Sequence, residues 1–309
     1  MGVSELETSN MKPETFAIGI DLGGSSVKGV LVSADGRLIL ERNQTFDPER
    51  RLAFAETVRN VVASLEAAHG CGVDAVGLSA PGLPAKDETS ISYLPNRLDG
   101  IEGLNWRQFL DRSNPVPVMN DAQAALLGEV WQGAARGLTN VIMLTLGTGV
   151  GGAAMVEGRL LRGRSGKAGH LGHVSLDLNG APDICGTPGS LELMIGNCTI
   201  AERTLGRYAT THNLIRAHEA GEPSATDVWM KSVKALACAV VSFTNVLDPE
   251  VVVIGGGIAR AGDVLFQPLR EFVSSMEWKV CGNEVQIVPA ELGELAGAWG
   301  AAIRALTGR

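Results

Sequence analysis

Apolar residues recur along this chain in short continuous runs and at helical spacing, a pattern that predicts alternating strands and helices. The run FAIGIDLGG ends at paired glycines, and VKGVLVSADGRLILERNQTF predicts two further strands joined at Asp35-Gly36, a dipeptide typical of hairpin turns. Residues 49–68 repeat apolar positions at helical spacing and predict an amphipathic helix. DAVGLSAPG and VPVMND then predict buried strands, and AQAALLGEVWQGA predicts a helix behind them.

The second half of the chain starts the same pattern again. NVIMLTLGTGVGGAAMVEGRLLRG indicates strand, glycine turn, strand, turn and a further strand, and a Gly- and polar-rich stretch covers about 163–190. Long helical segments follow, of which VKALACAVVSFTNVL is the clearest, and VVVIGGG and VQIVPA predict two more strands. The Ala-rich segment ELAGAWGAAIRAL predicts a last helix. Because each half begins with a strand hairpin and a glycine turn, we interpret the chain as an internal duplication of one α/β unit.

The length and this repetition indicate two domains. With 309 residues the chain is about twice as long as a typical domain. We expect an N-terminal tail at residues 1–15, a small α/β lobe at 16–119 and a large α/β lobe at 120–294. The final helix, at about 295–307, is expected to pack back on the small lobe.

Composition narrows the class of protein. The formal net charge of −8 disfavours a nucleic-acid partner, since a duplex-binding protein usually carries a basic face. The sequence pattern shows no apolar run long enough to span a bilayer, and the acidic first residues do not have the pattern of a signal peptide, so we expect a cytoplasmic protein without a membrane partner. The five cysteines form no CxxC pair, a pattern that argues against a disulfide scaffold in so large a chain expected in the cytosol.

Three glycine turns are candidates for binding the phosphates of ATP. Glycine lets backbone amides approach a phosphate without a side chain in the way, and Ser25 and Thr148 add hydroxyl donors. Asp21 would repel bare phosphate but suits the Mg²⁺ that accompanies ATP, so we expect it on the metal side, in indirect contact with the ion. The alternative for each turn taken alone is a tight hairpin. The expected ATP-binding residues are Asp21, Gly23, Gly24, Ser25, Lys28, Gly147, Thr148, Gly149, Gly255, Gly256 and Gly257.

Two common phosphate-binding motifs do not fit these turns. The segment from Gly147 to Gly152 loosely matches GxGxxG, but that dinucleotide signature opens a helix, whereas the strand-like AAMVEG follows here. A Walker-type GxxxxGK[ST] sequence is absent. Both the Rossmann and the P-loop interpretations therefore fail on context.

The order of several short motifs resembles a known family. DLGGSSVKG, APGLPA, PVMNDAQAALLGE, LTLGTGVGG, AGHLGH, GTPGSLE and VVVIGGG follow the order seen in the ROK family of sugar kinases and related repressors, from about residue 16 to the C-terminus. The resemblance implies a two-lobed actin-like ATPase (ribonuclease H-like) fold, with ATP and sugar in the cleft between the lobes. The repressors carry a DNA-binding helix-turn-helix before the first strand, and about 15 polar residues are too few for it, which favours the kinase branch.

The resemblance also implies roles for particular residues. Asp121 corresponds to the catalytic base that takes the proton of the sugar hydroxyl, a role that an acid at a strand end can fill. The alternative is an N-cap for a helix beginning at Ala122. The residues implied to contact the sugar are Asn96, Asn120, His170, His173 and Glu192. For Asn96, a turn residue beside proline is an equal alternative.

Two departures from the family pattern affect the sugar and the metal. The AGExGH sequence of the family reads AGHLGH here, so His170 replaces a glutamate, which makes glucose, the default substrate by analogy, doubtful. The structural zinc of the family takes one histidine and three cysteines, but here only His173 and Cys185 remain, with Asp183 and Ser190 in place of two cysteines. A structural zinc site is ordinarily closed by four N or S ligands, so we predict that zinc is absent.

The combined expectation is an ATP-dependent kinase that phosphorylates a hexose or hexosamine, at its primary hydroxyl, with Mg²⁺ as cofactor. Two rivals stay open at this stage: a sugar-sensing regulator without turnover, and a polymerising or chaperone-like ATPase of the same fold. Polyphosphate in place of ATP also stays open. By analogy with the family, the protein is expected to form a homodimer.

Overall fold

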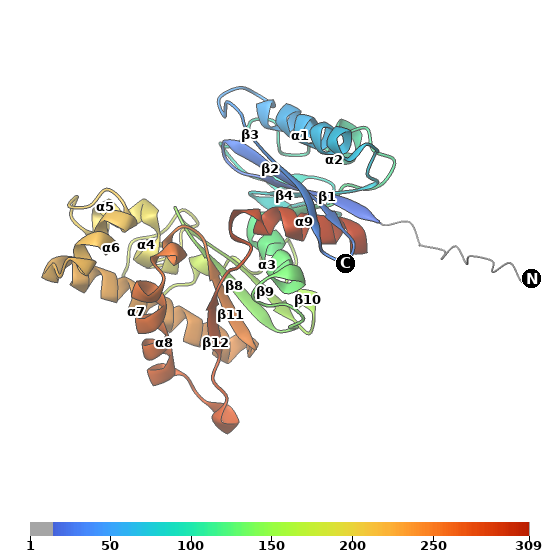
Figure 1. The fold of residues 1–309 in the computed structure, drawn as a ribbon. Helices are drawn as coiled ribbons and strands as arrows, with labels where there is room; N and C mark the ends of the chain where they lie inside the picture. Colours follow the sequence, from blue (N-terminus) through green and yellow to red (C-terminus); the bar gives the residue numbers. More distant parts are fainter. Residues whose placement is uncertain (1–14, 309) are drawn as a thin grey trace, which may run out of the picture.

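The computed structural model describes residues 15–308, so the tail expected at 1–15 lies outside the described residues except for its last position. Two five-stranded sheets form the framework (Figure 1). The first sheet has the order β3-β2-β1-β4-β7, and its strands are β1 (Phe16–Leu22), β2 (Ser26–Ser33), β3 (Leu38–Thr45), β4 (Ala75–Ala80) and β7 (Val118–Asn120). The second has the order β10-β9-β8-β11-β12, and its strands are β8 (Val141–Leu146), β9 (Val150–Val156), β10 (Arg159–Leu160), β11 (Val251–Gly255) and β12 (Gln286–Pro289).

The two sheets have the same topology. In the first, β1 and β2, and β2 and β3, pair antiparallel, whereas β1 and β4, and β4 and β7, pair parallel. In the second, β8, β9 and β10 are joined by antiparallel pairing and β8, β11 and β12 by parallel pairing. This agreement supports the interpretation of the sequence as a duplication. A separate two-stranded ribbon consists of β5 (Leu83–Pro84) and β6 (Ile91–Tyr93).

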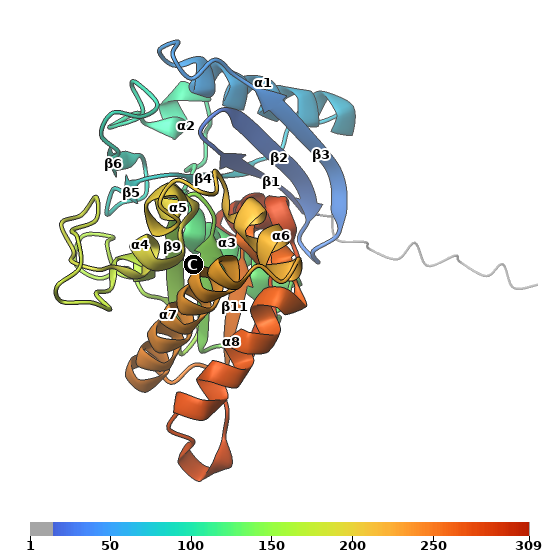
Figure 2. The same ribbon diagram turned by 90° about the vertical axis from the view of Figure 1, so that its left-hand side faces the viewer.

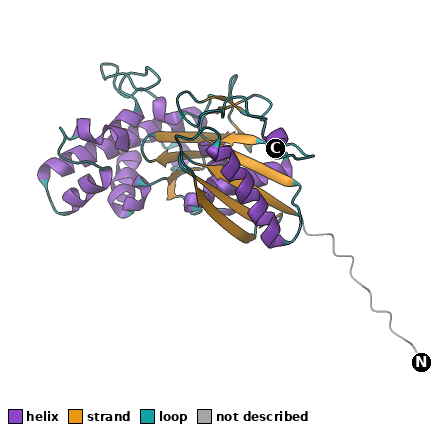
Figure 3. Cartoon of the chain, turned by 90° about the horizontal axis from the view of Figure 1, so that it is seen from above, coloured by secondary structure: helices purple, strands orange, loops and turns teal. Residues whose placement is uncertain are grey.

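Helices cover both sheets. The α-helices are α1 (Ala53–His69), α2 (Trp106–Phe109), α3 (Asp121–Gln132), α4 (Leu191–Ile195), α5 (Ile200–Arg203), α6 (Thr211–Glu219), α7 (Pro223–Leu247), α8 (Asp263–Met276) and α9 (Ala296–Thr307). Short 3₁₀ helices are η1 (Leu171–His173), η2 (Asn197–Thr199), η3 (Ile258–Ala261), η4 (Val280–Gly282) and η5 (Gly293–Leu295). Seen from above, helices α4–α8 gather at one end of the molecule, beside the strands (Figure 3).

Strands β1 and β2 of the first sheet are covered on both faces, by helices from opposite ends of the chain. The amphipathic helix α1 covers the outer face of β1–β3 (Figure 2), as the apolar spacing of residues 49–68 predicted, although it begins only at Ala53. Its start is displaced because Leu52 has a left-handed φ of 58° and cannot continue a helix. The other face packs against α9. A Cβ on Gly19 would lie 1.8 Å from the carbonyl oxygen of Ala298, so only glycine lets the helix backbone approach the strand.

Two central helices lie side by side between the sheets. α3 and α9 are in contact along their length, and Figure 1 shows both between the two sheets. The approach is backbone to backbone, since a Cβ on Gly300 would lie 1.7 Å from the carbonyl oxygen of Ala124. The division into lobes at 119/120 and 294/295 is compatible with this arrangement but stays a prediction, because α3 and α9 pack on each other as well as on the sheets.

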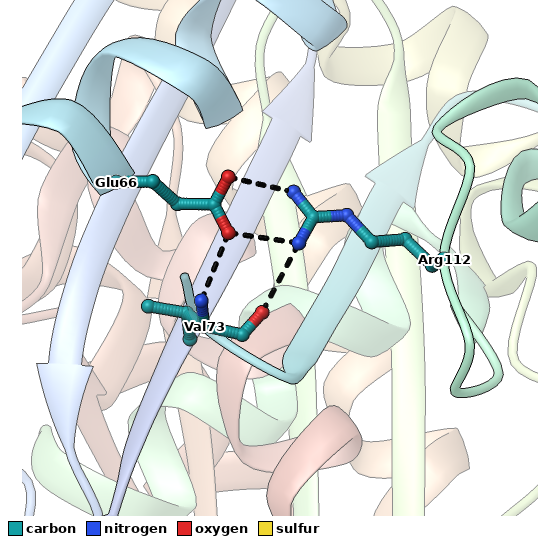
Figure 4. A network of polar contacts seen from close by, with 3 residues as sticks. All are labelled: Glu66, Val73 and Arg112. Carbon is teal, nitrogen blue, oxygen red and sulfur yellow. Dashed lines mark hydrogen bonds and ion pairs between the residues drawn. The ribbon is translucent and has the colours of Figure 1, made fainter. Parts of the chain in front are cut away.

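A partly buried polar network fixes the end of α1. The guanidinium of Arg112 donates two hydrogen bonds to the carboxylate of Glu66, at 2.8 and 2.9 Å, and the same carboxylate accepts the N–H of Val73 (Figure 4). Burial by itself raises the pKa of Glu66, but the bonds from Arg112 and Val73 lower it below its ordinary value. The paired geometry holds the turn before β4 in place.

The second sheet packs against the longest helix of the structure. Among residues 15–308, α7 alone has the length and apolar composition of a membrane span, with an 18-residue window of mean hydropathy 1.3. Composition cannot distinguish such a span from a core helix. In the structure, α7 contacts α4, α6 and α8, and Trp229, Leu236 and Val240 on it are fully buried. Its apolar composition is therefore explained by packing in the core of the second half.

Candidate active site

A cleft between the two sheets collects the main acidic and glycine residues singled out in the sequence. Its cavity of about 690 Å³ is lined by Asp21 at the end of β1, Lys28 on β2 and Asp121 at the start of α3. The glycines 255–257, at the end of β11, line it from the side of the second sheet. The structure thus brings two carboxylates and one of the three glycine turns together around a common space.

The start of α3 places Asp121 in this cleft. Asn120 is the N-cap: its Oδ1 accepts the N–H of Ala122 at 3.0 Å and that of Gln123 at 3.4 Å. The helix therefore begins at Asp121, whose Oδ1 also accepts the N–H of Ala122, at 2.8 Å. Capping and a role for Asp121 in the cleft are consequently compatible, with Asn120 providing the cap.

The protein environment of Asp121 favours the protonated carboxyl more than water would. The side chain is accessible from the cleft, but protein surrounds the remaining sides, and this desolvation raises the pKa of Asp121 above its ordinary value. The N–H of Ala122 and the charges of His170 and Arg97 act in the opposite direction and lower it. His170 and Arg97 are therefore close enough to Asp121 to affect its charge.

Asp21 is the second acid of the cleft. Burial raises the pKa of Asp21 to about 6, the hydrogen bond from Ser79 lowers it, the charge of Asp121 raises it, and Lys28 lowers it. The hydroxyl of Ser79 donates to Asp21 Oδ1 at 2.6 Å. Parallel pairing of β1 with β4 sets these two residues opposite each other. The charge of Asp121 therefore reaches Asp21 across the cleft.

Two basic side chains at the edge of the cleft share one carboxylate. Glu294, in η5, accepts hydrogen bonds from Lys28 Nζ at 2.8 Å and from Arg260 Nη2 at 2.6 Å. All three residues line the cavity of about 690 Å³. Lys28 comes from the first sheet and Arg260 from η3 beside the second, so Glu294 connects the two sides of the cleft.

The other expected phosphate turns lie elsewhere around the cleft. Gly24 and Asn96 line a neighbouring cavity of about 940 Å³. The turn at 147–149 lies against Glu192, whose Oε2 accepts the N–H of Val150 at 2.9 Å. A Cβ on Gly149 would lie 2.2 Å from that oxygen. The roles of Gly23, Gly24, Ser25, Gly147, Thr148 and Gly149 in ATP binding therefore stay predictions.

The two histidines of AGHLGH have defined hydrogen bonds. Nδ1 of His170 lies 2.9 Å from the carbonyl oxygen of Lys167, and because a carbonyl only accepts, this nitrogen carries the proton. Nε2 of a neutral His170 is then an acceptor. Nδ1 of His173 lies 2.8 Å from Asp183 Oδ2. Both rings thus have one nitrogen used by the protein and one left for a ligand.

The loop that holds zinc in the family is closed here by hydrogen bonds around Asp183. Its buried carboxylate accepts from His173 and from the N–H groups of Cys185 and Thr187, both within 2.9 Å of Oδ1. Burial alone raises the pKa of Asp183, but these bonds and the neighbouring Ser190 lower it to about 2. His173, Asp183 and Cys185 offer three ligand atoms within 4.8 Å of one another, but the carboxylate is already engaged. This donor set does not fit a closed N/S zinc site.

Sequence reasoning missed four polar residues of this site: Ser79, Arg97, Arg260 and Glu294. Ser79 was detectable in principle, since aligning IGID with VGLS as parallel strands places it opposite Asp21. Glu294 and Lys28 are 266 positions apart, and no local pattern relates them. Arg97 is in a loop without periodicity.

Two similar lobes around an acidic cleft define the actin-like ATPase class, and the comparisons agree. The sequence model of the ROK family matches residues 17–307. Glucokinase from Thermotoga maritima is 35% identical, over 94% of this chain and 97% of that protein. The crystal structure of the ROK hexokinase from Thermus thermophilus is similar with a TM-score of 0.81 and 30% identity, covering 94% of this chain and 97% of that one. A ROK family glucokinase from Streptomyces griseus, solved in complex with glucose and AMPPNP, gives a TM-score of 0.74 at 26% identity, with 93% and 98% covered.

The chain belongs to the ROK family, and its fold is the two-lobed actin-like ATPase fold. Its relatives of known name support a sugar-kinase activity.

Proposed function

We propose that this protein transfers a phosphoryl group from ATP to a hydroxyl group of a hexose or hexose derivative, with Asp121 as the general base. The observation that carries the proposal is the placement of Asp121 and Asp21 in one cleft with the glycine end of β11. Phosphoryl transfer depends mainly on alignment and charge stabilisation, with a carboxylate to orient and deprotonate the attacking hydroxyl. The kinases among the relatives, including one solved with glucose and AMPPNP, support the same reaction class.

The atoms around Asp121 suit a base. Oδ1 is held by the N–H of Ala122, which leaves Oδ2 to accept the proton of the sugar hydroxyl. A pKa raised by desolvation brings the carboxylate closer to the working pH, where a general base is most efficient.

The acids of the cleft also fit the Mg²⁺ that accompanies ATP. Carboxylate oxygens are the ligands Mg²⁺ prefers, and Asp21 lies at the cleft with a carboxyl whose anion is destabilised by burial until a cation approaches. When bound, the ion neutralises phosphate charge. Asp21 is the residue that would hold it, directly or through water.

The remaining hydrogen-bonding capacity defines the sugar site. Asn120 uses Oδ1 for capping and Nδ2 for a bond to the carbonyl of Gly82 at 3.1 Å, so one N–H is left for a sugar. Glu192 keeps Oε1, and His170 and His173 each keep Nε2. Asn96 would approach from the neighbouring cavity. Glucose is the default candidate because relatives are named glucokinases, but the histidine at position 170 argues for a different hexose or hexosamine as the preferred substrate.

The test is ATP consumption measured with and without a panel of hexoses, hexosamines and their derivatives, with polyphosphate as an alternative donor. We expect sugar-dependent turnover of ATP. Asp121→Asn should lower kcat by about 10² to 10⁴-fold while sugar affinity, measured by calorimetry, is largely kept. Asp227→Asn, which changes an exposed acid on α7, is the matched control and should leave kcat unchanged.

Two outcomes would contradict the proposal. If Asp121→Asn keeps more than about a third of kcat, Asp121 is not the base. If the wild-type protein binds a sugar but turns over neither ATP nor polyphosphate, the non-catalytic sugar-sensing regulator becomes the better interpretation.

A further inference from the structure

The loop at residues 94–102 carries an arginine to the edge of the cleft. This loop lines the cavity of about 940 Å³ together with Gly24 of the β1–β2 turn. Arg97 is exposed on it, next to Asn96. No motif of the sequence and no role proposed above uses this side chain.

The residues on both sides of Arg97 have an unusual, left-handed backbone conformation. Asn96 has a φ of 59° and Leu98 a φ of 50°, so both adopt the left-handed conformation that residues other than glycine rarely take. Such strain persists where surrounding contacts enforce it. Leu98 is 6% exposed and belongs to the core of the first sheet, and its carbonyl accepts the N–H of Ile101 at 3.0 Å. The loop is also held by Glu102, whose carboxylate accepts the N–H of Leu94 at 2.6 Å. These contacts therefore hold the backbone of Arg97 in a defined position, from which its side chain extends.

The guanidinium of Arg97 lies over the first glycine turn and near the base. Its Nη2 is 3.5 Å from the position a Cβ on Gly24 would take. Its charge is close enough to Asp121 to lower the pKa of that carboxyl. Within the described part of the chain it makes no hydrogen bond or ion pair. Lys28 and Arg260, the two cations on the other side of the cleft, are both paired with Glu294.

These positions define what Arg97 can bind. A guanidinium between an amide-rich glycine turn and a general base is placed where the phosphoryl donor and the sugar hydroxyl must meet. Its planar array of donors matches the oxygens of a phosphate. In a protein with a formal net charge of −8, an unpaired cation at this point supplies local positive charge that the chain as a whole lacks.

We infer that Arg97 binds the phosphoryl group while it passes from the donor to the sugar. The inference rests on the proposed kinase function and names a further catalytic residue for it. In the reaction the bond between the γ-phosphorus and the bridging oxygen of ATP breaks, ADP leaves with that electron pair, and the sugar oxygen forms the new bond. The hydroxyl proton goes to Asp121, and Arg97 keeps its own protons throughout.

Kinetics of Arg97→Ala and Arg97→Lys test the inference. We expect Arg97→Ala to lower kcat by about 10² to 10³-fold, the loss typical of one donor that stabilises transition-state charge. The sugar Kd, measured without nucleotide, should change less than about threefold. Arg97→Lys should recover part of kcat, because it restores the charge but not the paired donors. Added guanidinium chloride, but not urea, should partly restore Arg97→Ala at concentrations that leave the protein folded.

A matched control separates this role from a loosened loop. Arg51→Ala removes another exposed arginine, whose guanidinium lies 3.6 Å from Asp99 of the same loop, and should leave kcat unchanged. The inference is overturned if Arg97→Ala keeps kcat within about threefold of wild type, or if it weakens sugar binding while kcat is kept, which would assign Arg97 to the sugar. Absence of turnover in the wild type is a separate result, since it contradicts the proposed function itself.

Discussion

The carboxyl group of Asp21 is destabilised as an anion in the folded protein, and this affects stability as a function of pH. Its pKa is raised from 3.8 to about 6 by burial. For a raised pKa, the contribution to folding stability is fully present below the unfolded value and is lost as the pH rises through the folded value. In the absence of Mg²⁺ and ATP, the protein should therefore lose stability between about pH 4 and pH 6 through this group.

The prediction is that Asp21→Asn stabilises the ligand-free protein above pH 6 but not below pH 4. The asparagine stays neutral at every pH and can keep the hydrogen bond from Ser79. The free energy of unfolding should rise by at most about 3 kcal/mol, since one pKa unit corresponds to about 1.4 kcal/mol. The rise should be smaller than this limit because the side chain is partly accessible from the cleft. Urea unfolding of both proteins at the two pH values measures it. Equal free energies of unfolding for wild type and Asp21→Asn above pH 6 would show that burial does not destabilise the charged form of Asp21.

The family resemblance implies that His170 takes the position of a carboxylate that accepts hydrogen bonds from sugar hydroxyls. Losing one bond to a charged group costs about 1.5 to 3 kcal/mol, or roughly 10- to 150-fold in affinity. We predict that His170→Glu improves kcat/KM for glucose relative to the best sugar of the panel. Because the new charge would also raise the pKa of Asp121, the comparison belongs on the alkaline plateau of the pH–rate profile. His170→Gln, which adds no charge, is the control.

If His170→Glu leaves the ratio of kcat/KM for glucose to kcat/KM for the best sugar unchanged, position 170 does not contribute to the choice of sugar. Glucose would then return as the leading candidate. A charge on His170 lowers the pKa of Asp121, and Nδ1 of the ring donates a hydrogen bond to the carbonyl oxygen of Lys167. Any contact of the His170 ring with the sugar therefore depends on Nε2 alone.

At the scale of elements, the segment from η1 to α4 keeps its shape through Asp183 where the family uses zinc. We predict that the purified protein carries no stoichiometric zinc and unfolds at the same urea concentration with and without a chelator. The physical reason is that both oxygens of Asp183 already accept hydrogen bonds, and Ser190 is a poor zinc ligand. Elemental analysis and unfolding in chelator measure these two quantities.

A gain-of-metal variant makes the zinc prediction sharper. Asp183→Cys combined with Ser190→Cys supplies, with His173 and Cys185, four N or S ligands, and we expect it to bind about one zinc per chain. About one zinc per chain in the wild type, or unfolding of the wild type by a chelator, would contradict the prediction, because structural zinc is coupled to folding.

The elements themselves could be predicted well from the sequence, and the site only in part. Apolar runs and helical spacing indicated the strands and the long helices because these periods follow directly from burial. Asp121 was indicated by its strand end and by the family resemblance. Ser79 beside Asp21 depends on the register of two parallel strands, and Arg97 on a loop with left-handed residues. Neither register nor loop conformation leaves a periodic signal in the sequence.

At the scale of the whole molecule, a buried carboxylate connects the two halves. Glu88, between β5 and β6, is 6% exposed and pairs with Arg304 of α9 and with Arg162, which follows β10 of the second sheet. Arg304 is largely buried and Arg162 more exposed, at 14% and 37% of their side-chain surfaces. Burial lowers the pKa of both arginines, as expected for cations removed from water.

We predict a definite order of stability losses for this ion cluster. Glu88→Ala should cost about 3 to 5 kcal/mol, because it leaves Arg304 buried without a partner. Arg162→Ala should cost about 1 kcal/mol or less, because Glu88 keeps Arg304 and the lost pair is partly exposed. Urea unfolding measures both, with the exposed Arg164→Ala as the control from the same segment. Equal losses for Glu88→Ala and Arg162→Ala would show that the link between the halves, rather than burial of Arg304, dominates.

The association of whole molecules was expected from the family alone, and the homodimer stays a prediction, as does the cytoplasmic location. The arrangement of the two halves could be predicted only through the resemblance. A duplicated pattern of strands and glycine turns indicates two similar units, but the pairing of α3 with α9 between them joins segments that no local pattern relates.

The position of α9 has a consequence for the order in which the protein acquires its structure during synthesis. The strands of the first sheet are complete at Asn120, but one face of that sheet is covered by α9, which follows every other described element along the chain. The ribosome adds about 5 to 20 residues per second, so the sheet waits roughly 10 to 35 s, with Ala17, Val30 and Val32 uncovered, before its last layer is made. During that interval a nascent chain of this protein presents an apolar surface that a chaperone can recognise, and the first half to be synthesised is among the last parts to be completed.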